Sequence, residues 1–217
     1  MLKLILSYSL LIAFAATAQA APLFEAKDGL LIIESESTRS KLGEWQEKSA
    51  LEGFAGEGYL EFTGNRPENG PPKSPLKYRF QVDKDGKYKL WIRAHQRLVA
   101  DNGEKARWDH CNDCYVRLDG NYKSGNDVPV EQLETDTKLY VNGKDTWNST
   151  KQLDFHHPET HKAVKRQPVY ELKAGRKYTL YISGRSQRFN MDRIILHHES
   201  IPQSKTTNPE LPESNRR

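Results

Sequence analysis

Apolar side chains recur at every second position in several short segments, and polar or turn-forming residues separate these segments. The segments with the clearest alternation are 60–62, 76–82, 88–94, 115–118 and 178–182. Alternation with a period of two predicts β-strands that bury one face, and no segment shows a convincing helical period. Pairs typical of turns lie at 85–86, 119–120, 142–143 and 174–175. The pattern predicts an all-β fold, a single β-sandwich or jelly roll.

The order of the segments predicts two neighbourhoods in space. Segments 78–82 and 88–94 are separated by a short polar turn, which predicts a β-hairpin. The apolar segments 31–36 and 190–196 are expected to lie side by side as the first and last strands of the sandwich.

Two long stretches, 96–110 and 125–165, carry little alternation, with a weak strand signal at 138–141. Long loops in a compact domain often carry function. Trp108 lies in the first stretch, and the sequence leaves packing and ligand contact equally open for it. Trp147 lies in the second, within a polar surrounding that disfavours burial.

Both ends of the chain differ from the middle. Residues 1–20 combine an early lysine, a short apolar run and small residues before a cleavage point, which predicts a secretory signal peptide. Residues 21–200 are expected to form one domain, and the polar, proline-containing tail 201–217 is expected to be disordered. No segment reaches the length of a membrane span, so we expect a secreted or periplasmic monomer.

The composition excludes one class of partner and permits another. The formal net charge is +4, and basic residues alternate with acidic ones, which does not indicate nucleic-acid binding. The mild positive excess permits an anionic partner. Ten tyrosines and four tryptophans are enough for a core and for an aromatic surface outside it.

The two cysteines, Cys111 and Cys114, predict a local disulfide, because thiols that lie close together in an exported protein are oxidised outside the cytosol. A thioredoxin-like redox pair needs a helix after the motif, whereas 115–120 has the pattern of a strand and a turn. A zinc site with His157 and His161 has neither a finger-like spacing nor a reducing compartment in its favour.

Six pieces of the sequence occur in an order typical of one family. These are an acidic opening strand at 33–36, a glycine-rich strand entry at 56–62 and a Gly-x-Tyr strand at 86–93. They are followed by a strand with an Asp-Gly turn at 115–120, an Ala-Gly turn at 172–180 and an Asn-x-Asp strand at 190–192. The order resembles carbohydrate-binding module family 6 and its relatives in the galactose-binding-like jelly-roll group, over roughly 30–198. The resemblance implies a non-catalytic module that holds a polysaccharide or oligosaccharide.

The resemblance also implies a sugar site at the loop end, where two aromatic rings clamp a sugar and an amide pairs with its hydroxyls. By position the rings are Tyr59 and Trp147, and the amide is Asn190. Packing of Tyr59 in the core and a turn-stabilising role for Asn190 are the alternatives. Arg185 and Arg188 flank the site; if both reach it, a carboxylated or sulfated glycan is favoured.

A structural calcium ion between the first and last strands is a further implication of the resemblance. Glu34 and Glu36 are expected on one face of the first strand, because side chains alternate along strands. Asp192 is expected beside them, and calcium prefers carboxylate ligands. The alternative is a solvated pair of acids with Asp192 bridged to an arginine.

Two other functional classes stay open at this stage. One is a jelly-roll polysaccharide-degrading enzyme, a lyase or a hydrolase, in which a Tyr or His side chain would act as the base. Candidates for that base are Tyr140, His156 and His161, but no motif assigns a catalytic residue. A structural or protein-interaction β-sandwich is the other alternative. The favoured interpretation is a non-catalytic carbohydrate-binding module.

Overall fold

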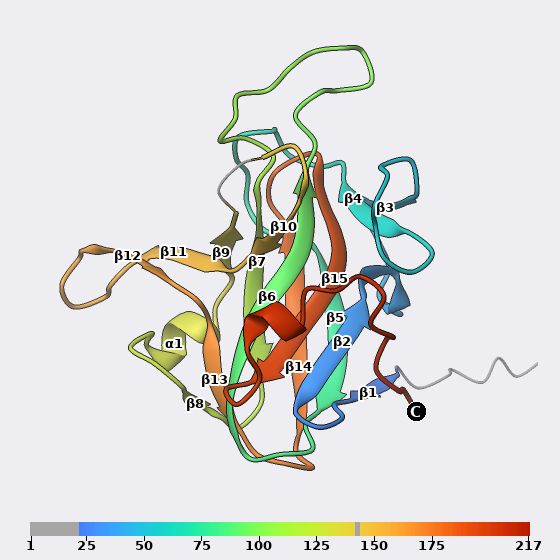
Figure 1. The fold of residues 1–217 in the computed structure, drawn as a ribbon. Coiled ribbons are helices and arrows are strands. Elements are labelled where there is room, and N and C mark those ends of the chain that lie inside the picture. Colours follow the sequence, from blue (N-terminus) through green and yellow to red (C-terminus); the bar gives the residue numbers. More distant parts are fainter. Residues whose placement is uncertain (1–21, 142–143) are drawn as a thin grey trace, which may run out of the picture.

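The computed structural model describes residues 22–141 and 144–217, and strands dominate this part of the chain. Two β-sheets form a sandwich (Figure 1), which confirms the predicted all-β jelly-roll class. The signal peptide predicted over 1–20 and the turn predicted at 142–143 lie outside the described residues.

One sheet has seven strands. In spatial order they are β1 (Leu23–Glu25), β5 (Lys73–Gln81), β14 (Lys177–Gly184), β7 (Asp113–Asp119), β9 (Thr137–Tyr140), β11 (Gln152–His156) and β12 (Ala163–Arg166). β1 runs parallel to β5, and the other neighbours are antiparallel.

The other sheet has eight strands, of which six follow one path. Along that path lie β3 (Trp45–Lys48), β4 (Tyr59–Phe62), β15 (Phe189–His198), β6 (Gly86–Gln96), β13 (Val169–Leu172) and β8 (Lys123–Ser124). Off the path, β10 (Trp147–Thr150) pairs with β6, and β2 (Leu30–Glu34) pairs with β15.

Helical structure is confined to short pieces in the described ranges: η1 (Ser35–Ser37), α1 (Val130–Leu133) and η2 (Gln203–Lys205). None of these is long and apolar enough to pass through a lipid bilayer.

The core lies between the two sheets and follows from the alternation in the sequence. Inward positions of β5 and β6, such as Leu76, Tyr78, Phe80, Leu90 and Ile92, are fully buried, while intervening positions face outward. Each such aliphatic or aromatic side chain contributes about 1.5–3 kcal/mol on burial. These contacts hold the sheets together and leave their outer faces for other roles.

The predicted hairpin between 78–82 and 88–94 is wrong, although both strands exist. β5 pairs with β1 and β14 in one sheet, whereas β6 pairs with β15, β13 and β10 in the other. The turn between them carries the chain across the core from sheet to sheet. Two strands that bury the same interior have the same alternation whether they are hydrogen-bonded neighbours or face each other.

The first and last apolar segments pair as predicted. β2 and β15 are antiparallel, with Glu34 opposite Arg193 and Leu30 opposite His197. In the long stretch 125–165 the weak strand signal corresponds to β9, and β10, β11 and β12 are additional strands.

The C-terminal residues 201–217, here called the strap, run along the outer face of the eight-stranded sheet, although the sequence predicted disorder. Ile32 and Ser214 are joined by a backbone hydrogen bond of 2.9 Å, and Trp91 Nε1 donates to Thr206 Oγ1 at 3.1 Å. Leu211 packs on a small apolar cluster formed by Ile32, Trp91 and Ile195. The strap is ordered because it covers this apolar patch, a long-range contact that its polar composition does not show.

Cys111 and Cys114 are free buried thiols in the structure, so the predicted disulfide is not formed there. Their side chains enter different surroundings. Cys114 lies on β7 and points into the core between the sheets, whereas Cys111 lies in a turn with φ of 57° and contacts the side chain of Arg188. Burial raises the pKa of Cys111 to about 11, which keeps it a neutral thiol.

Candidate functional site

Three predicted site residues come together on the outer face of the eight-stranded sheet. Asn190 on β15 lies opposite Glu61 of β4 on one side and His95 of β6 on the other, and His95 lies opposite Trp147 of β10. Directly opposed residues share a face, so these four form a row across the sheet. Tyr59 lies two positions before Glu61 on the same face of β4.

Tyr59 and Trp147 contact each other instead of forming an open clamp. Their ring centroids are 5.3 Å apart at an interplanar angle of 70°, and Phe54 packs on the other side of Tyr59 at 5.8 Å. Tyr59 is 2% exposed, and its hydroxyl accepts a hydrogen bond from Leu51 N. The Tyr59 ring is therefore part of the packing and has no face open to a sugar.

Trp147 is half-buried and has four neighbours. Its ring makes an edge contact with His95 at 5.3 Å, the Arg93 guanidinium lies 5.1 Å from the ring, and Nε1 donates to the carbonyl of Glu52 at 2.9 Å. Glu52 belongs to the loop 49–58, which crosses this face between β3 and β4. The indole anchors that loop to the sheet.

Asn190 is fully buried and serves the backbone. Its Nδ2 donates to the carbonyls of His95 at 3.1 Å and Arg188 at 2.9 Å, which fixes the entry into β15. Its Oδ1 has no partner in the structure. The turn-stabilising alternative considered from the sequence agrees with this geometry.

A polar pocket of about 500 Å³ opens beside this row, and we call it the loop-end pocket. It lies between the β3–β4 edge, the start of the 97–110 loop and the turn before β15, and it is lined by Gln46, Lys48, Glu61, Thr63, Pro67, Arg97, Ala100, Asp101, Asn102, Glu104, Gln187 and Arg188. The 97–110 loop projects beyond the sandwich at this end (Figure 1). Most of the lining side chains carry amide, carboxylate or guanidinium groups.

Arg188 is the most unusual residue of this pocket. The side chain is 6% exposed, its Nε has no hydrogen-bond partner, and Nη1 makes a long contact of 3.4 Å with the Glu104 carbonyl. Throughout the described part of the chain, no carboxylate forms an ion pair with it. Its backbone has φ of 67° and donates to the Phe62 carbonyl at 2.7 Å, so the tight turn fixes where the guanidinium lies. A buried guanidinium without an acidic partner is costly.

Arg97 is neutralised, in contrast to Arg188. Its guanidinium forms a two-point pair with Glu61, with Nε–Oε2 at 2.6 Å and Nη2–Oε1 at 2.8 Å, and a third contact with Asp101 at 2.9 Å. These partners raise the pKa of Arg97 further above its ordinary value. The Arg97–Glu61 pair therefore gives the pocket a fixed wall of paired charge.

Arg185 does not reach the loop-end pocket. Its guanidinium pairs with Asp113 and the carbonyl of Glu68, and it lies 5.9 Å from the Tyr115 ring on the seven-stranded sheet. Of the two arginines predicted from the sequence, the structure places Arg188 in the pocket and Arg185 in a structural ion pair.

The predicted calcium ligands do not assemble into a calcium site. Glu34 pairs with Arg193, and Asp192 pairs with Arg93 and accepts the backbone N–H of Ala55 at 3.1 Å. β2 ends at Glu34, so Glu36 lies in η1 and not on the same strand face. Within the described ranges, no group of three acidic, His or Cys side chains is arranged to hold a metal ion.

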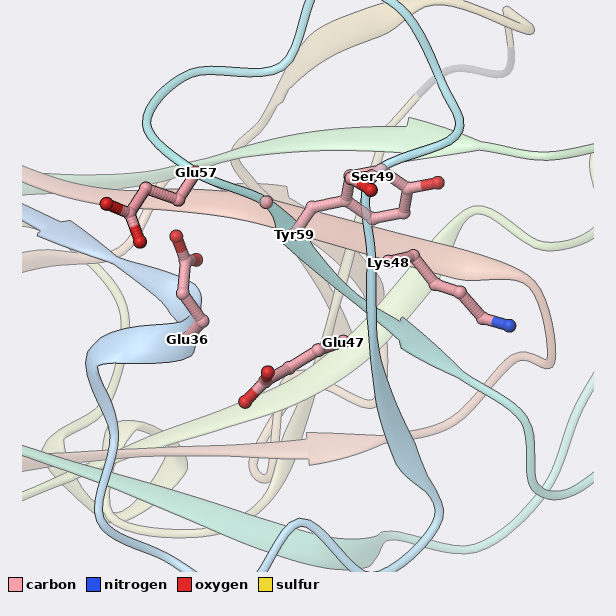
Figure 2. A pocket seen from close by; sticks show the side chains of 7 residues that line it. Glu36, Glu47, Lys48, Ser49, Glu57 and Tyr59 are labelled. Carbon is pink, nitrogen blue, oxygen red and sulfur yellow. The ribbon is translucent and has the colours of Figure 1, made fainter.

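Glu36 instead lines a small acidic pocket of about 280 Å³ between η1 and β3. Figure 2 shows its carboxylate directed toward that of Glu57, with Lys48 pointing away. Burial is the main cause that raises the pKa of Glu36 to about 7. The negative charge of Glu34 also raises this pKa, and the backbone hydrogen bond of Glu36 lowers it. Because arginines already neutralise Glu34 and Asp192, these residues do not fit a bound calcium ion. The ion pair between Asp192 and Arg93 agrees with the alternative in which an arginine bridges Asp192.

Sequence reasoning missed most of the residues that line the loop-end pocket. Gln46 and Lys48 occupy outward positions of β3, and Arg97 continues the outward series Arg93, His95, Arg97 at the end of β6. For Arg97 the available signal was the series of polar residues at alternate positions of the apolar strand β6, whereas β3 is polar at three of its four positions. Gln187 carries no such signal, because only the tertiary turn brings it to the pocket.

No protein-family model matches the sequence, and no match was found among curated proteins. Several solved structures are similar. A GH26-CBM35 β-(1,4)-mannanase from Podospora anserina matches with a TM-score of 0.48 and 15% identity, over 81% of this chain and 29% of that one. The chain thus spans less than a third of that enzyme.

Two isolated modules are also similar. The CBM35 from Paenibacillus barcinonensis matches with a TM-score of 0.40 and 13% identity, over 77% of this chain and 98% of that one. The C-terminal CBM6 of LamC, a laminarinase from Zobellia galactanivorans, matches with a TM-score of 0.40 and 17% identity over the same shares. The family that the sequence resembles thus recurs among the similar structures. Similarity of this degree assigns no ligand and no residue role, which follow from the side chains of this chain.

Proposed function

We propose that the protein is an exported, non-catalytic carbohydrate-binding module whose loop-end pocket holds an anionic polysaccharide. The observation that carries the proposal is Arg188, a buried guanidinium that lines a polar pocket and has no carboxylate partner among the described residues. A uronate carboxylate entering the pocket would supply the missing charge. A hydrogen bond to a charged group contributes about 1.5–3 kcal/mol.

The remaining lining suits the hydroxyl groups of a sugar. Gln46, Asn102 and Gln187 offer planar amides that both donate and accept, and Thr63 adds a hydroxyl. The ordered sequence pieces that resemble carbohydrate-binding module family 6 point to the same class of ligand. A shallow polar site of this kind favours modest affinity, because each sugar hydroxyl exchanges one set of hydrogen bonds for another.

Trp108 supplies the aromatic surface that Tyr59 and Trp147 do not. Its side chain is 66% exposed on the same loop that lines the pocket. The backbone beneath it is fixed, because the buried Gln96 amide donates to the carbonyls of Trp108 and His110. An exposed indole on a backbone held in this way is a suitable platform for the apolar face of a pyranose.

The test is affinity electrophoresis of the protein in gels that contain polygalacturonate, alginate or a neutral glucan. We expect retardation by the uronate polymers and little by the glucan, with no unsaturated or reducing-end product. Retardation by the neutral glucan alone would remove the anionic part of the proposal. Product formation would identify an enzyme, and absence of both signals would favour a protein-interaction domain.

Two variants connect the signal to the pocket. Arg188→Gln is expected to reduce retardation at least tenfold, and a thermal melt checks that the turn still folds. Lys48→Gln changes an exposed side chain on the edge strand β3 and cannot unfold the core. Its matched control is Lys123→Gln on β8, the opposite edge of the same sheet. Equal effects of the two lysine variants would contradict a local site.

A further inference from the structure

A further pocket shares no lining residue with the loop-end pocket and is lined by side chains of one charge sign. It measures about 440 Å³ and is lined by Arg39, Ser40, Lys41, Pro75 and Lys77. We call it the edge pocket. Three of its five lining residues are cationic and none is acidic.

The local structure explains why this pocket forms on β5. β1 pairs with Arg79–Gln81 at the end of β5 and leaves its first half without a neighbour on that side. Pro75 removes one backbone donor from the unpaired part. The segment 38–41 lies there instead: Lys77 N donates to Ser40 Oγ at 2.8 Å, and Thr38 Oγ1 donates to the Lys77 carbonyl at 3.2 Å.

These contacts hold the cations in a defined arrangement. Ser40 is bound to the β5 backbone, and Leu42 packs against the core, so Lys41 between them is directed outward. Lys77 occupies an outward position of β5, with its Nζ 5.5 Å from the Tyr181 ring. The backbone positions of both lysines are therefore set by the fold.

The three cations are not neutralised within the described residues. The ion pairs of that part of the chain include none made by Arg39, Lys41 or Lys77; the nearby Glu44 pairs with Lys73. Arg39 also lines a separate pocket of about 380 Å³, whose other charged residues are Glu34, Glu36, Glu57, Glu213 and Arg216. Lys41 and Lys77 belong to the edge pocket alone.

We propose that the edge pocket is a second ligand site, which binds the sulfate ester groups of a sulfated polysaccharide. Lysine ammonium groups are compact point charges that approach a tetrahedral oxyanion from several directions, whereas a planar carboxylate is best met by the fork of an arginine. Two lysines and one arginine around Pro75 and the lysine stems suit a sulfated sugar ring, with an apolar floor beneath it. The pocket is large enough for such a unit.

Phosphate groups share the tetrahedral oxyanion chemistry, and a nucleic acid would be their source. The rest of the surface disfavours that partner, because the net charge of +4 is small and Arg117, next to Tyr181, is paired with Asp119 and Asp136. One sulfated sugar unit needs only a local group of cations, whereas nucleic-acid binding is typical of an extended basic surface.

The experiment measures binding of the protein to dextran sulfate, to unsulfated dextran and to single-stranded DNA by titration calorimetry at low and moderate salt. We expect binding to dextran sulfate that weakens with salt, and none to dextran. The variant Lys41→Gln/Lys77→Gln is expected to lose at least tenfold in affinity. The control Lys84→Gln/Lys162→Gln removes the same charge from exposed positions elsewhere and is expected to change it less than twofold.

The other outcomes overturn the inference. Equal losses in both double variants would show non-specific charge attraction, and tighter binding of DNA than dextran sulfate would assign the site to phosphate. Loss through Arg188→Gln but not through Lys41→Gln/Lys77→Gln would place sulfate in the loop-end pocket. Polygalacturonate retardation is expected to be unchanged in Lys41→Gln/Lys77→Gln, so failure at the edge pocket and failure of the proposed function are distinguishable.

Discussion

Arg193 and Glu34 face each other across the last and first strands of the eight-stranded sheet and form a two-point ion pair. Both residues are buried, at 6% and 8% exposure, and Arg193 also donates to the Leu211 carbonyl of the strap at 2.7 Å. One guanidinium thus connects the beginning, the closing strand and the end of the described chain. Burial raises the pKa of Glu34, and Arg193 opposes that rise.

Removal of one partner of this pair is expected to be costly. Arg193→Met leaves the Glu34 carboxylate buried without a cation, which costs about 3–5 kcal/mol. The double variant Glu34→Gln/Arg193→Met removes both charges and is expected to be clearly more stable than Arg193→Met alone. Urea unfolding followed by circular dichroism measures both. If the loss of stability in the double variant equals the sum of the losses in Arg193→Met and Glu34→Gln measured separately, the two residues are not coupled.

The strap is expected to stabilise the sandwich through the patch that it covers. A chain that ends at residue 200 exposes Ile32, Trp91 and Ile195, which are at most 3% exposed in the structure. We expect a loss of about 3–6 kcal/mol in the free energy of unfolding and a red shift of Trp91 fluorescence. Leu211→Ala should show a smaller loss, and its neighbour Glu210→Ala, which changes an exposed side chain, should show none. Unchanged stability after truncation would mean that the strap only lies on the surface.

His197 is expected to make stability depend on pH. It is 1% exposed, its Nδ1 lies 2.9 Å from the Ile201 carbonyl, and burial with the charges of Lys89 and Lys151 lowers its pKa from 6.5. Well above pH 6.5 the His197 ring is neutral in both the folded and the unfolded protein, so its titration does not change the free energy of unfolding. Below that pH the unfolded chain binds a proton first, so stability falls with decreasing pH until the folded pKa is passed, by at most about 1.4 kcal/mol per pH unit.

The comparison for this effect is His197→Asn, whose amide can still donate to the Ile201 carbonyl. His95 has a pKa lowered in the same direction, so the measured quantity is the difference between the parent and the variant between pH 7 and pH 5. Equal pH dependence of the two proteins would exclude His197 as the titrating group.

The two tryptophans of the loop end are expected to respond in opposite ways. Trp108→Ala should weaken retardation by a uronate polymer about tenfold with an unchanged melting temperature, because its indole is exposed and the loss of a stacking ring costs about 1–1.5 kcal/mol. Trp147→Ala should lower stability by about 2–4 kcal/mol, because its ring packs on Tyr59 and His95. Affinity electrophoresis and thermal melts of both variants check this. Weaker retardation of Trp147→Ala with an unchanged melting temperature, and the opposite result for Trp108→Ala, would mean that Trp147 and not Trp108 contacts the ligand.

The fold class could be predicted from the sequence, because alternation reports directly on burial, and the pairing of the first and last apolar segments was also predicted. The partners of the other strands could not be predicted. The segment 78–82 and the segment 88–94 look like a hairpin, yet they lie in different sheets. Alternation states which face a strand buries and is silent on whether its neighbour in sequence is beside it or across the core.

The candidate site shows the same limit at the level of single side chains. Tyr59, Trp147 and Asn190 are brought together as the sequence suggested. However, the loop 49–58 packs on the two rings, and the polar side-chain atoms of all three residues bind the backbone. Whether an aromatic ring is exposed depends on which loop folds over it, a long-range property. Arg188 was predicted, and its decisive feature, burial without an acidic partner, is visible only in three dimensions.

The backbone hydrogen bonds between Leu23 and Arg217, at 2.9 and 3.1 Å, join β1 to the end of the strap. Leu23 lies opposite Arg79, six residues along β5 from Lys73, and Lys73 faces the end of β14 that leads to the loop-end pocket. At about 3.3 Å per residue, both ends of the described chain are about 20 Å from that end of the sheet. Leu23 and Arg217 therefore lie side by side at one end of the sandwich, and the loop-end pocket lies toward the other end.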